Sequence, residues 1–290
     1  QQGGGALPAD RRVRSVRPQP PTPLPYPVVD THCHLDISRA GTDGLDVTEA
    51  LDLAAAVNVR RIVQIGCDLP GARWAVAAAE QYDRLVAGVA LHPNEVPALA
   101  AEGRLDAALD EIETLAASSP RVRAIGETGL DHFRTPEEGW SVQETAFAAH
   151  IDLARRLDKT LVIHDRDAHD DVLRVLAEHP APERVVMHCF SGDAEMAREC
   201  VARGYWLSFA GTVTFKNADA LRVALAVTPL DRILVETDAP YLTPVPYRGK
   251  NNASYLVPYT VRRIAEVKGV DEELLCRTLA ANTEAAFGRR

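Results

Sequence analysis

The chain has 290 residues, of which 46% are hydrophobic and 25% charged, and its net charge is −9. This length suits one large α/β domain or two small ones, and no apolar run approaches the roughly 18 to 20 residues that a membrane span requires. The acidic balance argues against a broad basic groove for nucleic acid, and five scattered cysteines without a CxxC pair favour reduced thiols in the cytoplasm.

The first 27 residues differ in composition from the rest. They contain seven prolines, several glycines and four arginines, with no periodic apolar face and no apolar segment typical of a signal peptide. We therefore expect residues 1–27 to form a disordered or extended tail, and residues 28–290 to form the folded domain.

From Val28 onward, short β-branched runs alternate with segments of helical pattern. Expected helices include residues 47–58, 71–82, 141–158 and 168–179, and the expected strands are residues 27–36, 61–67, 85–93, 123–130, 160–167, 184–192, 205–213 and 232–240. Phe147, Ile151 and Ala154 follow the helical i, i+4, i+7 spacing. The strand runs are apolar on both sides, as in a buried parallel sheet. Eight such units predict a single (β/α)8 TIM-type barrel, with a doubly wound open sheet as the main rival.

Polar residues of metal-binding type stand at the C-terminal ends of these strands. His32 and His34 are two residues apart, so an alternating strand directs both side chains to one face. Later strands end in His92, Glu127, His164, His188 and Asp238. Because the C-terminal ends of barrel strands meet at one face, where active sites of this fold lie, this pattern predicts a metal centre there.

The ligand types indicate more than one ion. Four histidines and two carboxylates exceed what a single catalytic zinc with an open position needs. We expect two divalent cations, one held mainly by the histidines of the first strand and one by those of the fifth and sixth, with Glu127 as the bridge. Asp238 would bind the first ion and accept a proton from the attacking water. Histidine favours zinc, manganese, iron or nickel over magnesium, although the sequence leaves the choice among these five metals open.

Six short motifs, in order and spacing, carry a family resemblance: DTHCHLD, IGETGLD, IHDRDA, HCFSG, ETDAPYLTP and RGKNN. They resemble those of the TatD-type metal-dependent deoxyribonucleases of the amidohydrolase superfamily, from about Val28 to the C-terminus. The resemblance implies a (β/α)8 barrel whose divalent metals hydrolyse DNA, often from the 3′ end, and RNA in some members. It also implies one metal on His32, His34, Glu127 and Asp238 and a second on Glu127, His164 and His188.

Four further residues are expected to contact substrate. His92 matches the family's HP position and could equally be a turn histidine. Arg166 and Arg248 are suited to clamp phosphate, since a guanidinium fork matches two phosphate oxygens. Asn252 lies in RGKNNAS, where many family members read RGKRNEP, so Ala253 replaces an acid and the substrate contacts of this loop differ.

Several other polar residues are expected to lie outside the ligand set. Asp30, behind the first histidine pair, is predicted to orient a metal-bound imidazole. His150 falls within a helical segment and is predicted to lie on the surface. Cys33 and Cys189 alternate with metal-facing histidines, so both thiols should point away from the site.

Three functions compete at this stage. The first is hydrolysis of phosphodiester bonds in DNA, at a single strand or strand end, which needs few phosphate contacts. The second is an amidohydrolase acting on a small amide, ester or lactone. Many such enzymes bridge their metals with a lysine on the fourth strand, whereas here Glu127 stands there and the four lysines lie elsewhere. The third is a non-catalytic metal-binding protein, which the intact ligand set disfavours. No membrane partner is expected, and a monomer is compatible with the size.

Overall fold

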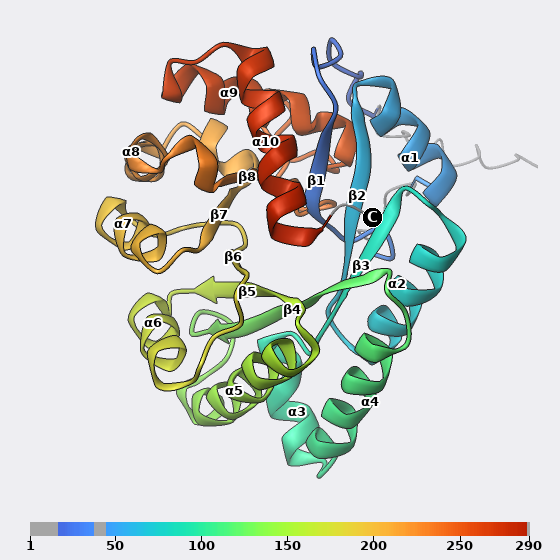
Figure 1. Ribbon diagram of the computed structural model, residues 1–290, viewed down its shortest axis with the longest axis vertical. Helices are drawn as coiled ribbons and strands as arrows, with labels where there is room; N and C mark the ends of the chain where they lie inside the picture. Colours follow the sequence, from blue (N-terminus) through green and yellow to red (C-terminus); the bar gives the residue numbers. More distant parts are fainter. Residues whose placement is uncertain (1–16, 38–44, 289–290) are drawn as a thin grey trace, which may run out of the picture.

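Eight strands line the middle of the molecule and the helices surround them (Figure 1). The computed structural model describes residues 17–37 and 45–288. The strands are β1 Val28–Cys33, β2 Val59–Gly66, β3 Leu85–Val89, β4 Val122–Asp131, β5 Thr160–Arg166, β6 Val185–Met187, β7 Trp206–Phe209 and β8 Ile233–Val235. The α-helices are α1 Val47–Ala56, α2 Leu69–Gln81, α3 Val96–Ala101, α4 Leu105–Ala117, α5 Trp140–Leu157, α6 His169–Glu178, α7 Ala194–Ala202, α8 Asp219–Val227, α9 Val257–Lys268 and α10 Glu272–Phe287. Short 3₁₀ turns are η1 Pro93–Glu95, η2 Glu137–Gly139, η3 Gly211–Thr214, η4 Leu230–Arg232 and η5 Ser254–Leu256.

The strand order follows the chain from β1 to β8, and each neighbouring pair is parallel. The circle closes just beyond β8, where Cys33 forms a parallel bridge with Ala239. Beside it, the Asp238 amide donates to the His32 carbonyl at 2.8 Å. An open sheet would change its strand order part-way, so the observed order and closure confirm the predicted (β/α)8 barrel.

Alternation along the strands creates two apolar regions. Side chains that point inward fill the barrel interior: Val63, Ile65, Ala124, Val162, Val186, Trp206 and Leu234, joined by Ala286 and Phe287 of α10. Thr160, the first residue of β5, donates to the Ala286 carbonyl, so the end of α10 closes the N-terminal end of the barrel. The interior is therefore packed, and the C-terminal ends of the strands are left for a site.

The outward side chains of the strands pack under the helices in a second, larger cluster. In α5, Phe147, Ile151 and Ala154 are fully buried, as their spacing predicts. Several helices begin at an aspartate whose side chain accepts from the backbone amides of the first turn, including Asp46 before α1 and Asp193 before α7. These caps satisfy amide groups that the helix itself leaves without acceptors.

Residues 17–27 contain no helix or strand and lie along the outside of the barrel. Leu24 is buried in the core cluster, the Tyr255 hydroxyl donates to the Pro18 carbonyl at 2.7 Å, and Arg262 donates to the Thr22 carbonyl at 2.7 Å. Residues 1–16 of the expected tail lie outside the described residues. Within the part of the chain that is described, no helix is both long and apolar enough to cross a membrane.

His150 is buried, so the prediction that it lies on the surface is wrong. Its Nε2 accepts from the Leu91 amide at 3.1 Å, and Nδ1 lies 2.7 Å from the Ala146 carbonyl. A neutral ring satisfies both contacts with one donor and one acceptor, and burial lowers the pKa of His150 to about 4. The helical period identified a buried face of α5 but could not show that the segment after β3 supplies a donor to this polar residue.

The buried imidazole makes stability depend on pH. Between pH 6.5, the ordinary pKa of histidine, and about pH 4, its pKa in the folded protein, His150 binds a proton in the unfolded chain but not in the folded one. This contribution is therefore present above pH 6.5 and is lost as pH falls, by about 2 kcal/mol between pH 7 and 5. We expect urea unfolding of His150→Gln to show a shallower loss of stability over this range than the wild type. His179→Gln, at the C-terminal end of α6, is the control, and equal slopes for wild type and His150→Gln would contradict the assignment.

Candidate metal centre

The Glu127 carboxylate lies at the centre of the imidazoles at the C-terminal ends of the strands. Its Oε1 is 3.3 Å from His32 Nε2 and 3.5 Å from His34 Nε2. Its Oε2 is 2.9 Å from His164 Nδ1 and 3.2 Å from His188 Nε2. The two oxygens of one side chain thus face two histidine pairs, one from β1 and the segment after it, the other from β5 and the segment after β6. The pairs meet where the His32 ring stacks on that of His188, with 3.5 Å between the centroids.

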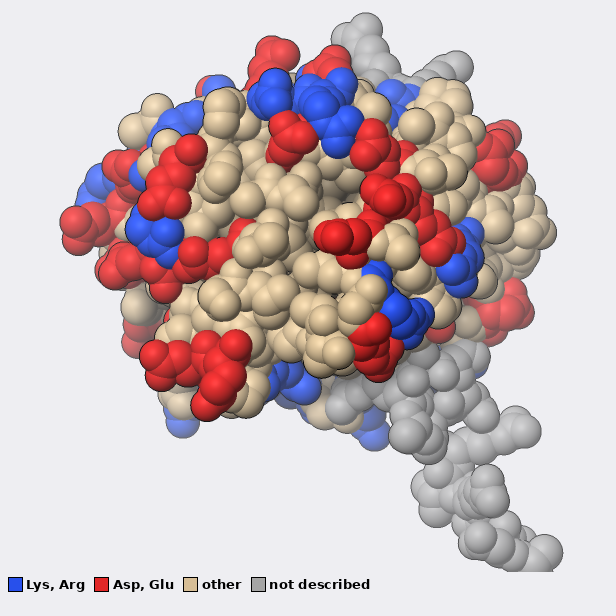
Figure 2. All heavy atoms as spheres, turned by 90° about the horizontal axis from the view of Figure 1, so that it is seen from below, with Lys and Arg blue, Asp and Glu red and all other residues tan. Residues whose placement is uncertain are grey.

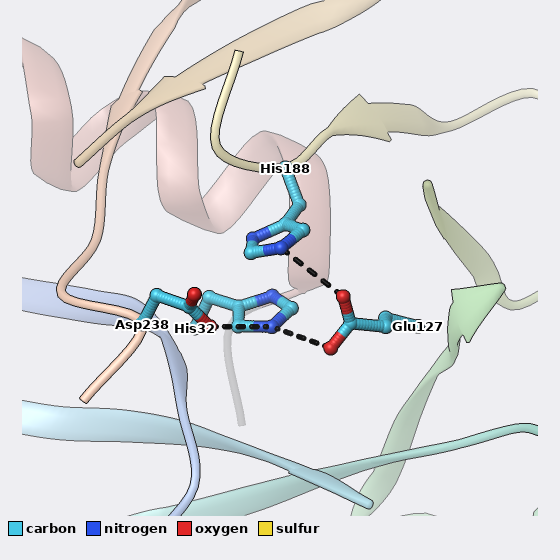
Figure 3. A group of neighbouring side chains, drawn as sticks. All are labelled: His32, Glu127, His188 and Asp238. Carbon is cyan, nitrogen blue, oxygen red and sulfur yellow. Dashed lines mark hydrogen bonds and ion pairs between the residues drawn. The ribbon is translucent and has the colours of Figure 1, made fainter. Parts of the chain in front are cut away.

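Asp238 lies across His32 from Glu127, and the side chains of both acids point toward the imidazoles (Figure 3). Asp238 Oδ1 is 3.1 Å from His34 Nε2 and 3.6 Å from His32 Nε2. Its carboxylate therefore faces the first histidine pair, which leaves Oδ2 for a water or substrate.

His92 joins the second donor group. Its Nε2 is 3.7 Å from Glu127 Oε2, and its ring centroid is 4.4 Å from that of His164. Nδ1 accepts from the Asn94 amide at 3.1 Å at the start of η1. The turn contact orients the ring, so His92 is both a turn histidine and a member of the cluster.

Three of the imidazoles are oriented by a contact on their other nitrogen. His34 Nδ1 lies 2.8 Å from the Ile65 carbonyl, and His188 Nδ1 lies 2.7 Å from Glu236 Oε2. His164 Nε2 lies 2.9 Å from Asp131 Oδ2. Such contacts set the ring orientation of metal-binding histidines. Glu236 was missed as a functional residue, although it directly follows Val235, the last apolar residue of β8.

Gly129 is required where β4 passes β5. It pairs with His164, has φ of +142°, and a Cβ at this position would lie 2.0 Å from the His164 carbonyl oxygen. Any side chain would push the two strands apart at the level of the cluster. The glycine therefore permits the close approach that brings His164 to Glu127.

Neighbouring groups in the cluster stabilise the ionised forms of Glu127 and His164. Burial alone would raise the pKa of Glu127, but His188 and His92 outweigh it and hold that pKa well below its usual range. Burial would lower the pKa of His164, but hydrogen bonds to Asp131 and Glu127 raise it to about 9. Glu127 is thus ionised, and His34, His164 and His188, whose pKa values are raised, carry protons where a cation would otherwise bind. Burial lowers the pKa of His32 and of His92, so these two rings are neutral.

The donor set fits divalent metal ions. Three groups place their donor atoms within 4.8 Å of one another: His32, Glu127, His188 and Asp238; His34, Cys67 and Glu127; and His92, Glu127 and His164. Imidazole and carboxylate donors of this kind suit zinc, manganese, iron or nickel. His32 Nδ1 is buried without a hydrogen-bond partner among the described residues, while its Nε2 faces the carboxylates of Glu127 and Asp238.

Comparison with known proteins identifies the family. Residues 29–288 match the family described as TatD related DNase. The chain belongs to the TatD family. It is 46% identical over 265 residues to the uncharacterized metal-dependent hydrolase TatD of Mycobacterium tuberculosis, covering 90% of this chain and 98% of that protein.

Two further similar proteins support the same family assignment. The uncharacterized metal-dependent hydrolase YcfH of Escherichia coli is 38% identical over 261 residues, covering 90% of this chain and 95% of that protein. The crystal structure of the TatD homolog YjjV from Escherichia coli has a TM-score of 0.82 at 28% identity, covering 91% of this chain and 98% of that one. The resemblance found in the motifs is confirmed, and the protein is a metal-dependent hydrolase of the TatD family.

The residues expected to contact substrate lie in different settings. Arg166 and Arg248 are exposed and cover the rings of Phe133 and Phe215, at 4.0 and 3.8 Å from the ring centroids. Asn252 is 5% exposed, and its amide donates to the carbonyls of Thr237 and Tyr241. Contrary to the expectation, Asn252 therefore holds the loop after β8 in place and does not present its amide to substrate.

Asp30 differs from its expected role. Its carboxylate accepts from the backbone amides of His32 and Thr237 and from the hydroxyls of Thr237 and Ser254, and no imidazole is among these partners. Burial raises the pKa of Asp30 to about 6. Asp30 thus ties β1 to the segment after β8, and the prediction that it orients an imidazole is wrong.

One cysteine side chain contacts the cluster. Cys67 Sγ is 3.4 Å from Glu127 Oε1 and 3.7 Å from His34 Nδ1, a contact that the sequence reading missed. Cys67 follows β2 directly, so the rule that identified the other ligands would have found it. Burial, and then the charges of Glu236, Asp238 and Glu127, raise the pKa of Cys189. That the Cys189 thiol points away from the site stays a prediction, whereas Cys33 is buried in the core.

Replacement of Glu127 should remove the carboxylate that both histidine pairs share. We expect Glu127→Ala and the volume-preserving Glu127→Gln to lose most bound metal, measured by elemental analysis after dialysis against dilute manganese or zinc. Glu178→Gln, on the exposed side of α6, should keep the wild-type metal content. Wild-type metal stoichiometry in both Glu127 variants would show that this carboxylate is not a ligand.

Proposed function

We propose that this TatD-family hydrolase cleaves phosphodiester bonds of DNA at the end of a single strand, from the 3′ end, with two divalent cations. The proposal is supported mainly by the positions of the two carboxylate oxygens of Glu127. Oε1 faces His32 and His34, and Oε2 faces His164 and His188. A carboxylate shared in this way is suited to bridge two ions. Two bound cations would clamp the phosphate oxygens and lower the pKa of an attacking water.

The protein's own groups supply position and proton transfer. A hydrogen bond from His34 and the charge of His188 overcome burial and lower the pKa of Asp238, so its carboxylate is ionised, which is the form that can accept a proton from water. Glu236 and the Ile65 carbonyl keep the imidazoles of His188 and His34 facing inward. The ligands are thus preorganised before substrate arrives.

Few cations are needed to hold a strand end. Arg166 is the last residue of β5 and Arg248 lies in the loop after β8, and within the described residues neither guanidinium is ion-paired with a carboxylate. On the face drawn in Figure 2, basic side chains form separate patches among acidic ones. Local arginines beside a metal centre suit an acidic protein better than a continuous basic groove.

Digestion of end-labelled single-stranded DNA tests the proposal. We expect loss of a 3′ label with manganese or magnesium, no loss in EDTA, and slower loss of a 5′ label. Asp238→Asn should lower the rate by about 10²- to 10⁴-fold, because the proton acceptor is removed and the shape is kept.

Asp219→Asn is the matched control, since this aspartate is 92% exposed at the start of α8, and it should retain wild-type activity. Full activity of Asp238→Asn would overturn the role of that acid. No digestion by folded, metal-loaded protein would instead favour hydrolysis of a small ester, lactone or amide.

A further inference from the structure

The Phe133 side chain is exposed to solvent on the turn that follows β4, close to the metal centre. Phe133 is 62% exposed, the largest fraction among the exposed large hydrophobic side chains of the described residues, and it lies two residues beyond the end of β4. Leaving most of a phenyl ring in water forgoes the favourable free energy of burying it. A ring exposed at the mouth of a barrel, where substrates enter, suggests a contact that forms only with a ligand.

The turn that carries this ring is held by a group that also holds the metal centre. Asp131 Oδ1 accepts from the backbone amides of Phe133 at 3.0 Å and Arg134 at 2.7 Å. Asp131 Oδ2 is 2.9 Å from His164 Nε2 and accepts from Asn94 at 3.1 Å. Asp131 is fully buried, so one carboxylate sets the position of a metal-facing imidazole and of the exposed ring together.

An arginine covers one face of the ring. The Arg166 guanidinium lies 4.0 Å from the Phe133 ring centroid, and the Arg166 carbonyl accepts from the His132 amide at 2.9 Å. The stacked guanidinium keeps its N–H edges directed sideways, where they can donate to phosphate oxygens. The ring remains open on its other side, as its exposed fraction requires.

We propose that Phe133 and Arg166 form a stacking platform for a base of a single-stranded nucleic acid, next to the phosphate that is cleaved. The proposal rests on the proposed function, which it deepens by naming what binds beside the metals. Every base has an aromatic face, so stacking on phenylalanine is tolerant of sequence. A base within a duplex is stacked on its neighbours, so the platform selects unpaired ends. Stacking also supplies affinity that does not depend on positive charge. This matters for a chain whose net charge is −9, because it attracts a polyanion less than a basic protein would.

The test compares an oligothymidylate with the same chain lacking the three bases at the end that is attacked. On the non-cleaving Asp238→Asn background, fluorescence anisotropy gives the affinity of each strand. Loss of stacking on one ring corresponds to about 5- to 150-fold in affinity. We therefore expect Phe133→Ala to weaken binding of the intact strand by that factor and to bring the intact-to-abasic ratio close to one.

Two further variants separate the ring from its volume. Phe133→Leu keeps an apolar side chain without an aromatic face and should behave like Phe133→Ala, whereas Phe133→Trp should keep the wild-type ratio. Leu274→Ala, which truncates another exposed apolar side chain on α10, should change nothing. An unchanged ratio in Phe133→Ala, or a wild-type ratio in Phe133→Leu, would overturn the platform.

Cleavage assays of the wild type with both strands separate this proposal from the proposed function. Binding that depends on the base and on Phe133, without metal-dependent cleavage of either strand, supports the platform and refutes the nuclease. Cleavage of both strands at equal rates, with equal affinities, supports the nuclease and refutes the platform.

Discussion

The structure of the site depends on a buried carboxylate that has to be neutralised. Glu127 is 3% exposed in the middle of the barrel mouth, and an isolated charge there would cost far more free energy than the fold can supply. Imidazoles from β1, β5 and the segments after β1, β3 and β6 surround it. No single strand could provide them, because neighbouring side chains on a strand alternate between opposite faces. Only the convergence of strand ends in a closed barrel brings five imidazoles to one carboxylate.

A second group of buried acids makes this arrangement rigid. Asp30 joins the backbone of β1 to the segment that carries Asp238. Glu236 holds the imidazole of His188 and also accepts from the Cys189 amide. Asp131 holds His164 and the turn beyond β4. Glu236 and Asp131 each connect a metal-facing imidazole to loop backbone, and Asp30 connects the backbone of β1 to the segment after β8, so the segments after these strands are held in position.

Charge links the metal centre to the choice of substrate. An acidic protein that acts on a polyanion has to concentrate positive charge where the substrate binds. In the proposed function, the metal ions and the two arginines at the mouth supply that charge. The Phe133 ring under Arg166 would then replace part of the phosphate contacts that a broad groove would make. Specificity for an unpaired strand end and a low net positive charge would thus have one structural origin.

The alternation of apolar strands with amphipathic helices determined the barrel, because burial on both faces of a parallel sheet requires continuous apolar runs. The position of histidines and acids at strand ends likewise determined the candidate ligand set, since the fold brings those ends together. These inferences depend on periodicity, which a linear sequence records directly.

Contacts between residues distant in the chain were decided only by the tertiary structure. His150 follows the buried stripe of α5, but its acceptor role depends on an amide beyond β3. Asn252 was expected to face substrate, whereas its amide hydrogens are used by carbonyls of its own loop. The contacts that define the roles of Cys67, Glu236 and Asp131 are made with residues 33 to 60 positions away in the sequence. A sequence specifies which groups a residue carries, but hydrogen-bond partners are set by distance and direction in space, which the packed barrel alone defines.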